Sequence, residues 1–338
     1  MRTSRSRLLN LARIVVAVLV LAAVIWGVAR SWPEISVDLQ RVDAIALLGS
    51  AVLAAVGTWL TMLGWRVLLA DLGSPLHLAP AGGVFFVGQL GKYLPGSVWT
   101  VFAQADMAAH LGVPRRRTGV VGLVTIGLSI LTGIIVGLPA IPHLLRSAGS
   151  AGSTGSTGST GSAGSVGSAW VLLAIPVLLL LCWPPLLNRI IALGLRVLRR
   201  EPLEHQLSTR AVLLTVALYV LAWLCFGGHT LILARAVVDA PGLTVPGLTV
   251  PALSGYALAG SLGMLTVILP AGLGAREGII ALVLASAMPL SAGTAVAIVS
   301  RFVITVVDVL AALAGWGYAR RHHLVASRPG EVLVGEED

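Results

Sequence analysis

The chain has 338 residues, of which 57 % are hydrophobic and only 11 % are charged, and its mean hydropathy is +0.93. Because a water-soluble domain carries about 25 % charged residues, this composition excludes a soluble globule. The formal net charge of +9 comes from arginines at the ends of apolar runs, which is the pattern that orients a membrane protein and not that of a nucleic-acid-binding protein. Short alternating segments typical of a membrane β-barrel are missing, so we predict an all-α integral membrane bundle.

Residues 1–43 are predicted to form an N-terminal anchor helix and an exterior loop. An apolar stretch from Ile14 to Ala29 follows a cluster of arginines. A cleaved signal peptide is the alternative, but a retained anchor is favoured because so much of the remaining chain is apolar enough to lie in the membrane. The arginines predict a cytoplasmic N-terminus.

Residues 44–146 are predicted to form the first membrane half, with spans at about 44–66 and 120–141. Between these spans, residues 79–109 are apolar but too long for one crossing, and both flanks carry the charges of a cytoplasmic side. We therefore expect a broken re-entrant hairpin, with Pro95 and Gly96 as its helix-breaking residues.

Two segments of different character follow. Residues 147–169 are almost entirely Gly, Ser, Thr and Ala, which predicts a flexible exterior linker. Residues 170–210 are predicted to hold one span and a basic cytoplasmic segment. The arginines at 189–210 favour an amphipathic helix that lies on the inner leaflet.

Residues 211–320 are predicted to form the second membrane half, with spans at 211–234 and 292–318 and a cytoplasmic tail at 321–338. A second broken hairpin, residues 253–289, is expected to enter from the exterior face. Its helix-breaking residues are Pro270, Gly272 and Gly274. The prediction is thus about six full spans plus two broken re-entrant hairpins in an inverted repeat, which is typical of transporter cores.

The first break reads GQLGKYLPGSVW and places a lysine beside residues that end a helix. Freed backbone N–H groups next to a lysine can bind an anion, so Lys92 and Tyr93 are predicted to bind substrate. The alternative is that Lys92 extends to the cytoplasmic interface. Nearby polar residues predicted to support the site are Gln89, Gln104 and Asp106.

The second break reads LPAGLGAREG, and Arg276 and Glu277 follow it directly. We expect Arg276 to hold a phosphate while Glu277 neutralises the charge of the arginine. The alternative is an exterior loop whose charges are solvated. Arg301 and Asp308 share one face of the last span. Arg301 is a candidate substrate ligand and Asp308 a supporting residue, but a structural ion pair with another helix explains this face equally well.

These residues carry a resemblance to a known family. GKYLPGSVW, HLGVPRRRT, LPAGLGAREG and the later Arg301 resemble the flippase-like transmembrane family named after the membrane domain of lysylphosphatidylglycerol synthase, over about residues 40–320. The resemblance implies a helical bundle with broken helices and a role in moving lipids or lipid-linked precursors. The synthase has a soluble aminoacyl-transfer domain after its membrane part, whereas only a short tail follows here, so lysine transfer is not expected.

We predict a transporter of the cytoplasmic membrane that flips an anionic phospholipid or a polyprenyl-phosphate-linked precursor. The alternatives are a membrane-embedded glycosyltransferase-type enzyme and a non-transporting scaffold for envelope lipid assembly. No cofactor or metal is expected, since the histidines and cysteines lack ligand spacing. Expected partners are a membrane lipid and the bilayer, with an envelope-biosynthesis enzyme or a second copy of the chain as candidate protein partners and no nucleic acid.

Overall fold

The computed structural model describes residues 42–93, 98–152, 180, 182–197, 199–201, 203–237, 247–265 and 274–321. In these ranges helices are connected by turns and coil and no strand is present, so the all-α membrane class is confirmed. The predicted anchor helix, most of the Gly/Ser/Thr linker, most of the span that begins at 170, and the C-terminal tail after 321 lie outside the described residues. So do the predicted helix-breaking residues Pro95, Gly96, Pro270 and Gly272.

Within the described residues, four helical segments are long and apolar enough to cross a membrane. They are α2 (Ala44–Asp71), the continuous Arg115–Ala148 segment, α9 (Thr209–Val237) and α12 (Leu290–Arg321). The Arg115–Ala148 segment combines α5 (Arg115–Gly137), η2 (Leu138–Ala140) and most of α6 (Ile141–Gly152). These four correspond to four of the predicted spans, and the other two predicted spans lie wholly or mostly outside the described residues.

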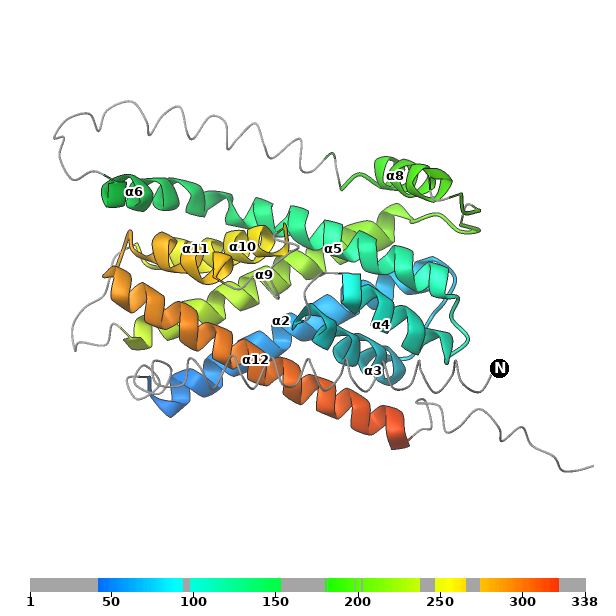
Figure 1. Cartoon of the computed structure of the whole chain (residues 1–338), viewed down its shortest axis with the longest axis horizontal. Coiled ribbons are helices and arrows are strands. Elements are labelled where there is room, and N and C mark those ends of the chain that lie inside the picture. Colours follow the sequence, from blue (N-terminus) through cyan, green and yellow to red (C-terminus); the bar gives the residue numbers. More distant parts are fainter. Residues whose placement is uncertain are drawn as a thin grey trace, which may run out of the picture.

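The two long apolar stretches between these spans are broken, as predicted. The first comprises α3 (Leu78–Gln89), the 3₁₀ turn η1 (Leu90–Tyr93) and α4 (Val98–Ala109), and the second comprises α10 (Thr249–Leu265) and α11 (Ala275–Leu284). With 12 residues in α3 and 10 in α11, neither helix approaches the roughly 20 residues that a span requires. Figure 1 shows α3 and α4 toward one end of the bundle and α10 and α11 toward the other.

The helices of the two halves pack in a reciprocal pattern (Figure 1). The first spans of the halves, α2 and α9, pack along each other, whereas α3 lies on α12 and α10 lies on α5. The short helices α4 and α11 each pack on the second span of their own half, α5 and α12. If the two halves are exchanged, the α3–α12 contact corresponds to the α10–α5 contact, and the α4–α5 contact corresponds to the α11–α12 contact. The α2–α9 contact corresponds to itself.

Glycines bring the backbones together at both of these cross-half contacts. A Cβ atom added at Gly137 of α5 would lie 2.7 Å from Leu258 Cα of α10, and one added at Gly315 of α12 would lie 3.2 Å from Gly83 Cα of α3. Small residues at helix contacts are the usual means of close packing in a membrane, where apolar burial supplies little attraction between helices.

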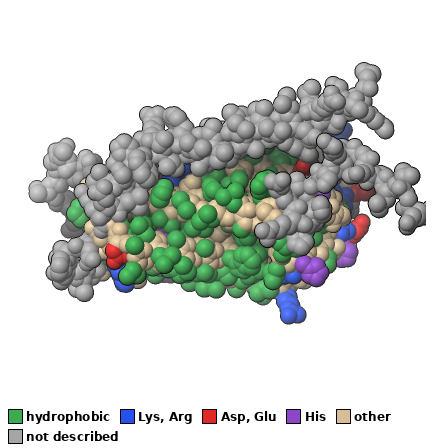
Figure 2. Space-filling model, turned by 90° about the horizontal axis from the view of Figure 1, so that it is seen from below, with side chains coloured by type: hydrophobic (Ala, Val, Ile, Leu, Met, Phe, Trp, Pro, Cys, Tyr) green, Lys and Arg blue, Asp and Glu red, His purple; other side chains and the backbone are tan. Residues whose placement is uncertain are grey.

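The face of the bundle that is seen from below is apolar along its middle and charged toward its ends. Figure 2 shows the apolar side chains on the face seen from below, with charged side chains toward both ends and histidines toward one of them. Large exposed apolar residues include Leu48 and Val52 of α2 and Leu310 and Leu313 of α12. An apolar belt of this kind is expected to contact lipid tails, because soluble proteins seldom expose large contiguous apolar patches.

Two element boundaries differ from the sequence predictions. Helix α6 continues to Gly152, into the range predicted to be coil, because Ile141 and Leu144 pack against Leu258 and Val283 and tie the helix to the bundle. The amphipathic helix predicted at 189–210 is instead α8 (Pro184–Val197). It ends before Arg199, whose positive φ of 53° is incompatible with a continuing α-helix.

Candidate functional site

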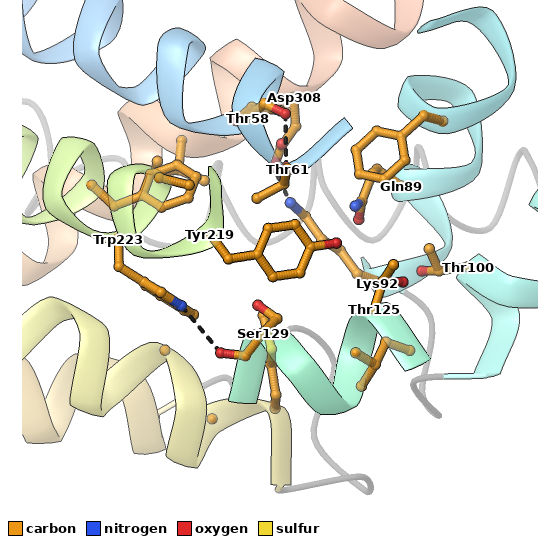
Figure 3. A pocket seen from close by; sticks show the side chains of 18 of the residues that line it. Thr58, Thr61, Gln89, Lys92, Thr100, Thr125, Ser129, Tyr219, Trp223 and Asp308 are labelled. Carbon is orange, nitrogen blue, oxygen red and sulfur yellow. Dashed lines mark hydrogen bonds and ion pairs between the residues drawn. The ribbon is translucent and has the colours of Figure 1, made fainter. Parts of the chain in front are cut away.

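The two broken stretches meet at a cavity of about 230 Å³ (Figure 3). The walls come from α2, α3, η1, α4, α5, α9, α10, α11 and α12, so both halves of the chain contribute. Pockets for drug-sized ligands have volumes of roughly 300–1,000 Å³. This cavity is therefore suited to a polar headgroup and not to a whole lipid with its tails.

Most of the residues predicted to form a site line this one cavity. They are Gln89, Lys92, Tyr93, Gln104, Arg276, Arg301 and Asp308. Lys92 and Tyr93 lie at the end of η1, where the first break begins, and Arg276 lies in the first turn of α11, where the second break ends. Residues that are far apart in the sequence thus converge from two interrupted helices.

Lys92 and Tyr93 both contact the carboxylate of Asp308. Lys92 Nζ lies 2.6 Å from Asp308 Oδ2, and the Tyr93 hydroxyl donates a hydrogen bond of 2.7 Å to the same oxygen. The Asp308 side chain is only 2 % exposed, and Figure 3 shows the Lys92 side chain reaching toward it. Lys92 is therefore paired with a buried carboxylate of the bundle.

Arg301 and Glu277 form a second ion pair, between α12 and α11. Arg301 Nη1 donates to Glu277 Oε1 at 2.5 Å, and the other carboxylate oxygen accepts a 2.8 Å hydrogen bond from the backbone N–H of Gly274. Gly274 has a φ of 83° and serves as the N-cap of α11. The predicted helix-breaking glycine and the predicted acid thus act together to begin this helix.

The expected pairing of Arg276 with Glu277 is therefore not what the structure shows. Consecutive residues of a helix point about 100° apart, so two neighbours do not share one face. Glu277 consequently bonds to Arg301 and to its own helix N-terminus, while Arg276 faces the cavity.

Arg276 is held by its flat face and not by its N–H groups. Its Cζ atom lies 4.8 Å from the centre of the Tyr256 ring, and that ring stacks on Phe226 with 5.5 Å between centroids. The Nε and Nη2 atoms of Arg276 are buried and have no hydrogen-bond partner within the described part of the chain. Because stacking uses only the face of a guanidinium, its in-plane donors remain available to a ligand.

The charges at the site do not balance. Lys92, Arg276 and Arg301 are three cations, whereas Asp308 and Glu277 are the two carboxylates that pair with Lys92 and Arg301. Among the described residues, Arg276 is thus the cation of the cavity that lacks a counter-ion. In these same ranges no group of three His, Cys, Asp or Glu side chains could hold a metal ion.

Several neutral polar residues of the cavity were not found by sequence analysis. They are Thr58, Thr61, Thr100, Thr125, Ser129 and Tyr219. They lie mostly on apolar spans, where an isolated hydroxyl resembles an ordinary membrane-helix residue. The available signal was their spacing, because Thr58 with Thr61, and Thr125 with Ser129, recur on one helical face.

One predicted supporting residue lies outside the cavity. Asp106 of α4 accepts a 3.0 Å ion-pair hydrogen bond from Arg115 at the start of α5. The Arg115 side chain is 63 % exposed, so the pair joins two consecutive helices near the surface. Sequence analysis grouped Asp106 with the first break because the two are close in the sequence, although Asp106 does not line the cavity.

Comparison with known proteins gives one family. The family whose description is "Lysylphosphatidylglycerol synthase TM region" matches residues 10–312, a range that contains both broken stretches and every residue lining the cavity. No curated protein matches the chain.

Proposed function

Because the chain belongs to the family of the lysylphosphatidylglycerol synthase transmembrane region and is a multi-pass membrane protein, we propose that it moves an anionic phospholipid or a polyprenyl-phosphate-linked precursor across the cytoplasmic membrane. The resemblance expected from the two short motifs is confirmed by the family match. The lipid and its movement are our proposal.

The guanidinium of Arg276, whose Nε and Nη2 have no hydrogen-bond partner in the described part of the chain, carries this proposal. A buried charged group without a partner costs free energy, and proteins normally supply a counter-ion or an ordered ligand. Arg276 faces a cavity of headgroup size with Nε and Nη2 unbonded, and a phosphate can accept hydrogen bonds from both donors at once. The phosphate of a membrane lipid is the anion that a site at this depth is expected to meet.

The reciprocal packing of the two halves supports a way for the headgroup to cross. Transporters built from inverted repeats keep their binding site near the bilayer centre, between interrupted helices, and open it alternately to each side. Here α3 and α4 lie toward one end of the bundle and α10 and α11 toward the other (Figure 1), and described residues on both sides of each interruption line the cavity. We propose that both stretches are re-entrant hairpins that enter from opposite membrane faces.

Arginine distribution favours a cytoplasmic location for the end of the bundle that contains α4 and α8. Arg115, Arg116 and Arg117 begin α5, and Arg189, Arg196 and Arg210 lie on α8 and at the start of α9. The positive-inside rule assigns such clusters to the cytoplasm. By the same rule the far end, where α6 lies, faces the exterior.

This orientation predicts the result of cysteine labelling in intact cells. In a background with Cys182 and Cys225 replaced by serine, a membrane-impermeant thiol reagent should label Ser150→Cys on α6 and leave Arg196→Cys on α8 unlabelled until the cells are opened. Labelling of Arg196→Cys alone in intact cells would show that the orientation is inverted.

The two alternative functions predict different behaviour in purified vesicles. An enzyme of the glycosyltransferase type would change the lipid chemically, and a scaffold would do nothing to it. We expect the purified protein, in vesicles with acyl-labelled fluorescent phosphatidylglycerol, to make inner-leaflet label accessible to an external quencher faster than in protein-free vesicles. Mass spectrometry should recover the lipid unchanged. Equal rates with and without protein would refute transport.

A further inference from the structure

Two carboxylates belong to the same site as Arg276 without pairing with it. Asp308 lines the same cavity, and Glu277 is the next residue of α11. Among the described residues, Asp308 pairs instead with Lys92, and Glu277 pairs with Arg301. An arginine side chain has several rotatable bonds, and opposite charges attract strongly in a poorly solvated site. A structural constraint is therefore needed to keep the guanidinium of Arg276 facing the cavity with Nε and Nη2 unbonded.

The ring of Tyr256 on α10 supplies this constraint. Arg276 Cζ lies 4.8 Å from the centre of the ring, and the Tyr256 side chain is buried in the bundle. A π face attracts a cation without using any of its N–H groups, so the contact leaves Nε and Nη2 available. These two N–H groups lie on one edge of the guanidinium and point the same way, which is the arrangement that binds two oxygens of one phosphate.

The ring is itself held in place by aromatic neighbours on α9. Phe226 stacks on Tyr256 with 5.5 Å between ring centroids, and the ring of Trp223 lies 6.3 Å from that of Tyr256. Trp223 Nε1 donates a 3.1 Å hydrogen bond to Ser129 O on α5. Gly260 of α10 leaves room for the indole, because a Cβ atom added there would lie 2.7 Å from Trp223. The ring that contacts Arg276 is thus fixed by contacts with α9, which is anchored in turn to α5.

We propose that Tyr256 is a positioning residue of the anion site. Its ring keeps the guanidinium of Arg276 away from the two carboxylates and presents Nε and Nη2 to the phosphate. This inference rests on the proposed function and specifies which residue makes Arg276 available. The role belongs to the ring and not to the hydroxyl, because the cation contacts the π face. Without the ring, Arg276 is expected to turn toward a carboxylate, and the lipid phosphate must then compete with the chain itself.

Binding of a water-soluble lipid tests this role. The probe is dihexanoyl phosphatidylglycerol, and its dissociation constant for the full-length protein in detergent is measured by microscale thermophoresis. We expect Tyr256→Leu to weaken binding about 3- to 30-fold, which is the range that a cation–π contact contributes in a desolvated site. Tyr256→Phe keeps the ring and should bind within about 2-fold of the wild type.

Two comparisons distinguish positioning from general packing. Phe86→Leu also removes a buried ring, but Phe86 does not line the cavity, so this variant should bind within about 2-fold of the wild type. In an Arg276→Ala background, Tyr256→Leu should weaken binding no further, because a ring that acts only through Arg276 then has nothing to position. A structural defect would instead lower the affinity in both backgrounds.

The outcomes separate the positioning role from the function. The role of Tyr256 is overturned, while the proposed function stands, if Tyr256→Leu binds as tightly as the wild type or if Tyr256→Phe binds as weakly as Tyr256→Leu. A loss that persists in the Arg276→Ala background overturns it as well. If the wild-type protein neither binds the probe nor moves phosphatidylglycerol in vesicles, the proposed function fails, and the positioning role fails with it.

Discussion

Replacing Arg276 by alanine is expected to lower the rate of lipid transport at least about 100-fold. Two hydrogen bonds from a charged donor contribute together about 3 kcal/mol or more, and each 1.4 kcal/mol corresponds to a factor of ten. Arg276→Lys keeps the charge but loses the planar pair of donors, so we expect an intermediate loss of about 10-fold. The measurement is the initial rate of phosphatidylglycerol transport at equal amounts of folded protein in the vesicles.

This loss should occur without loss of stability. Because Nε and Nη2 of Arg276 have no partner in the described structure, removing the guanidinium also removes the cost of burying it. The matched control is Arg146→Ala on α6, whose Nε bonds to Pro142 O on the same helix at an exposed position. Normal transport by Arg276→Ala, or a fall in its thermal stability that accounts for the lost rate, would contradict the assigned role.

Replacing Asp308 by alanine is expected to have the largest effect on folding. The change leaves Lys92 Nζ and the Tyr93 hydroxyl without their shared acceptor. Breaking a fully buried ion pair costs about 3–5 kcal/mol, and the loss here is expected to be smaller because the Lys92 side chain is 34 % exposed. The measurement is the thermal midpoint of the detergent-solubilised protein, followed by fluorescence-detected gel filtration.

A second substitution distinguishes loss of the pair from loss of packing. Lys92→Met removes the charge that Asp308→Ala leaves unpaired, so the double variant should be more stable than Asp308→Ala alone. Glu204→Ala is the control, because Glu204 is 70 % exposed in its pair with Arg117 and such surface pairs contribute about 0–1 kcal/mol. A double variant that is no more stable than the single one would show that Lys92 and Asp308 are not coupled.

The helices could be predicted from the sequence because a membrane span requires a long run of apolar residues, which is visible locally in the sequence. Apolar runs of sufficient length mark α2, α9 and α12, and glycine and proline mark the two interruptions. The ends of helices depend on tertiary contacts, which cannot be predicted from the neighbouring residues in the sequence. Helix α6 therefore extends beyond its predicted end, because Ile141 and Leu144 are held by α10 and α11.

The candidate site could be predicted only as a set of residues. Charge at membrane depth identified Lys92, Arg276, Arg301 and Asp308, and the structure brings all four to one cavity. Their pairing could not be predicted, because it depends on which helices become neighbours. Glu277 pairs with Arg301, 24 residues away, and not with the adjacent Arg276. The availability of the Arg276 donors, on which the proposed function rests, is thus a property of the tertiary structure of the described residues.

The most direct test is an experimental structure of the protein in a bilayer nanodisc that contains phosphatidylglycerol. We predict a lipid headgroup in the cavity, with phosphate oxygens within about 2.7–3.2 Å of Nε and Nη2 of Arg276. A cavity without lipid, in which Arg276 bonds instead to a carboxylate or a carbonyl of the chain itself, would contradict an anion-binding role.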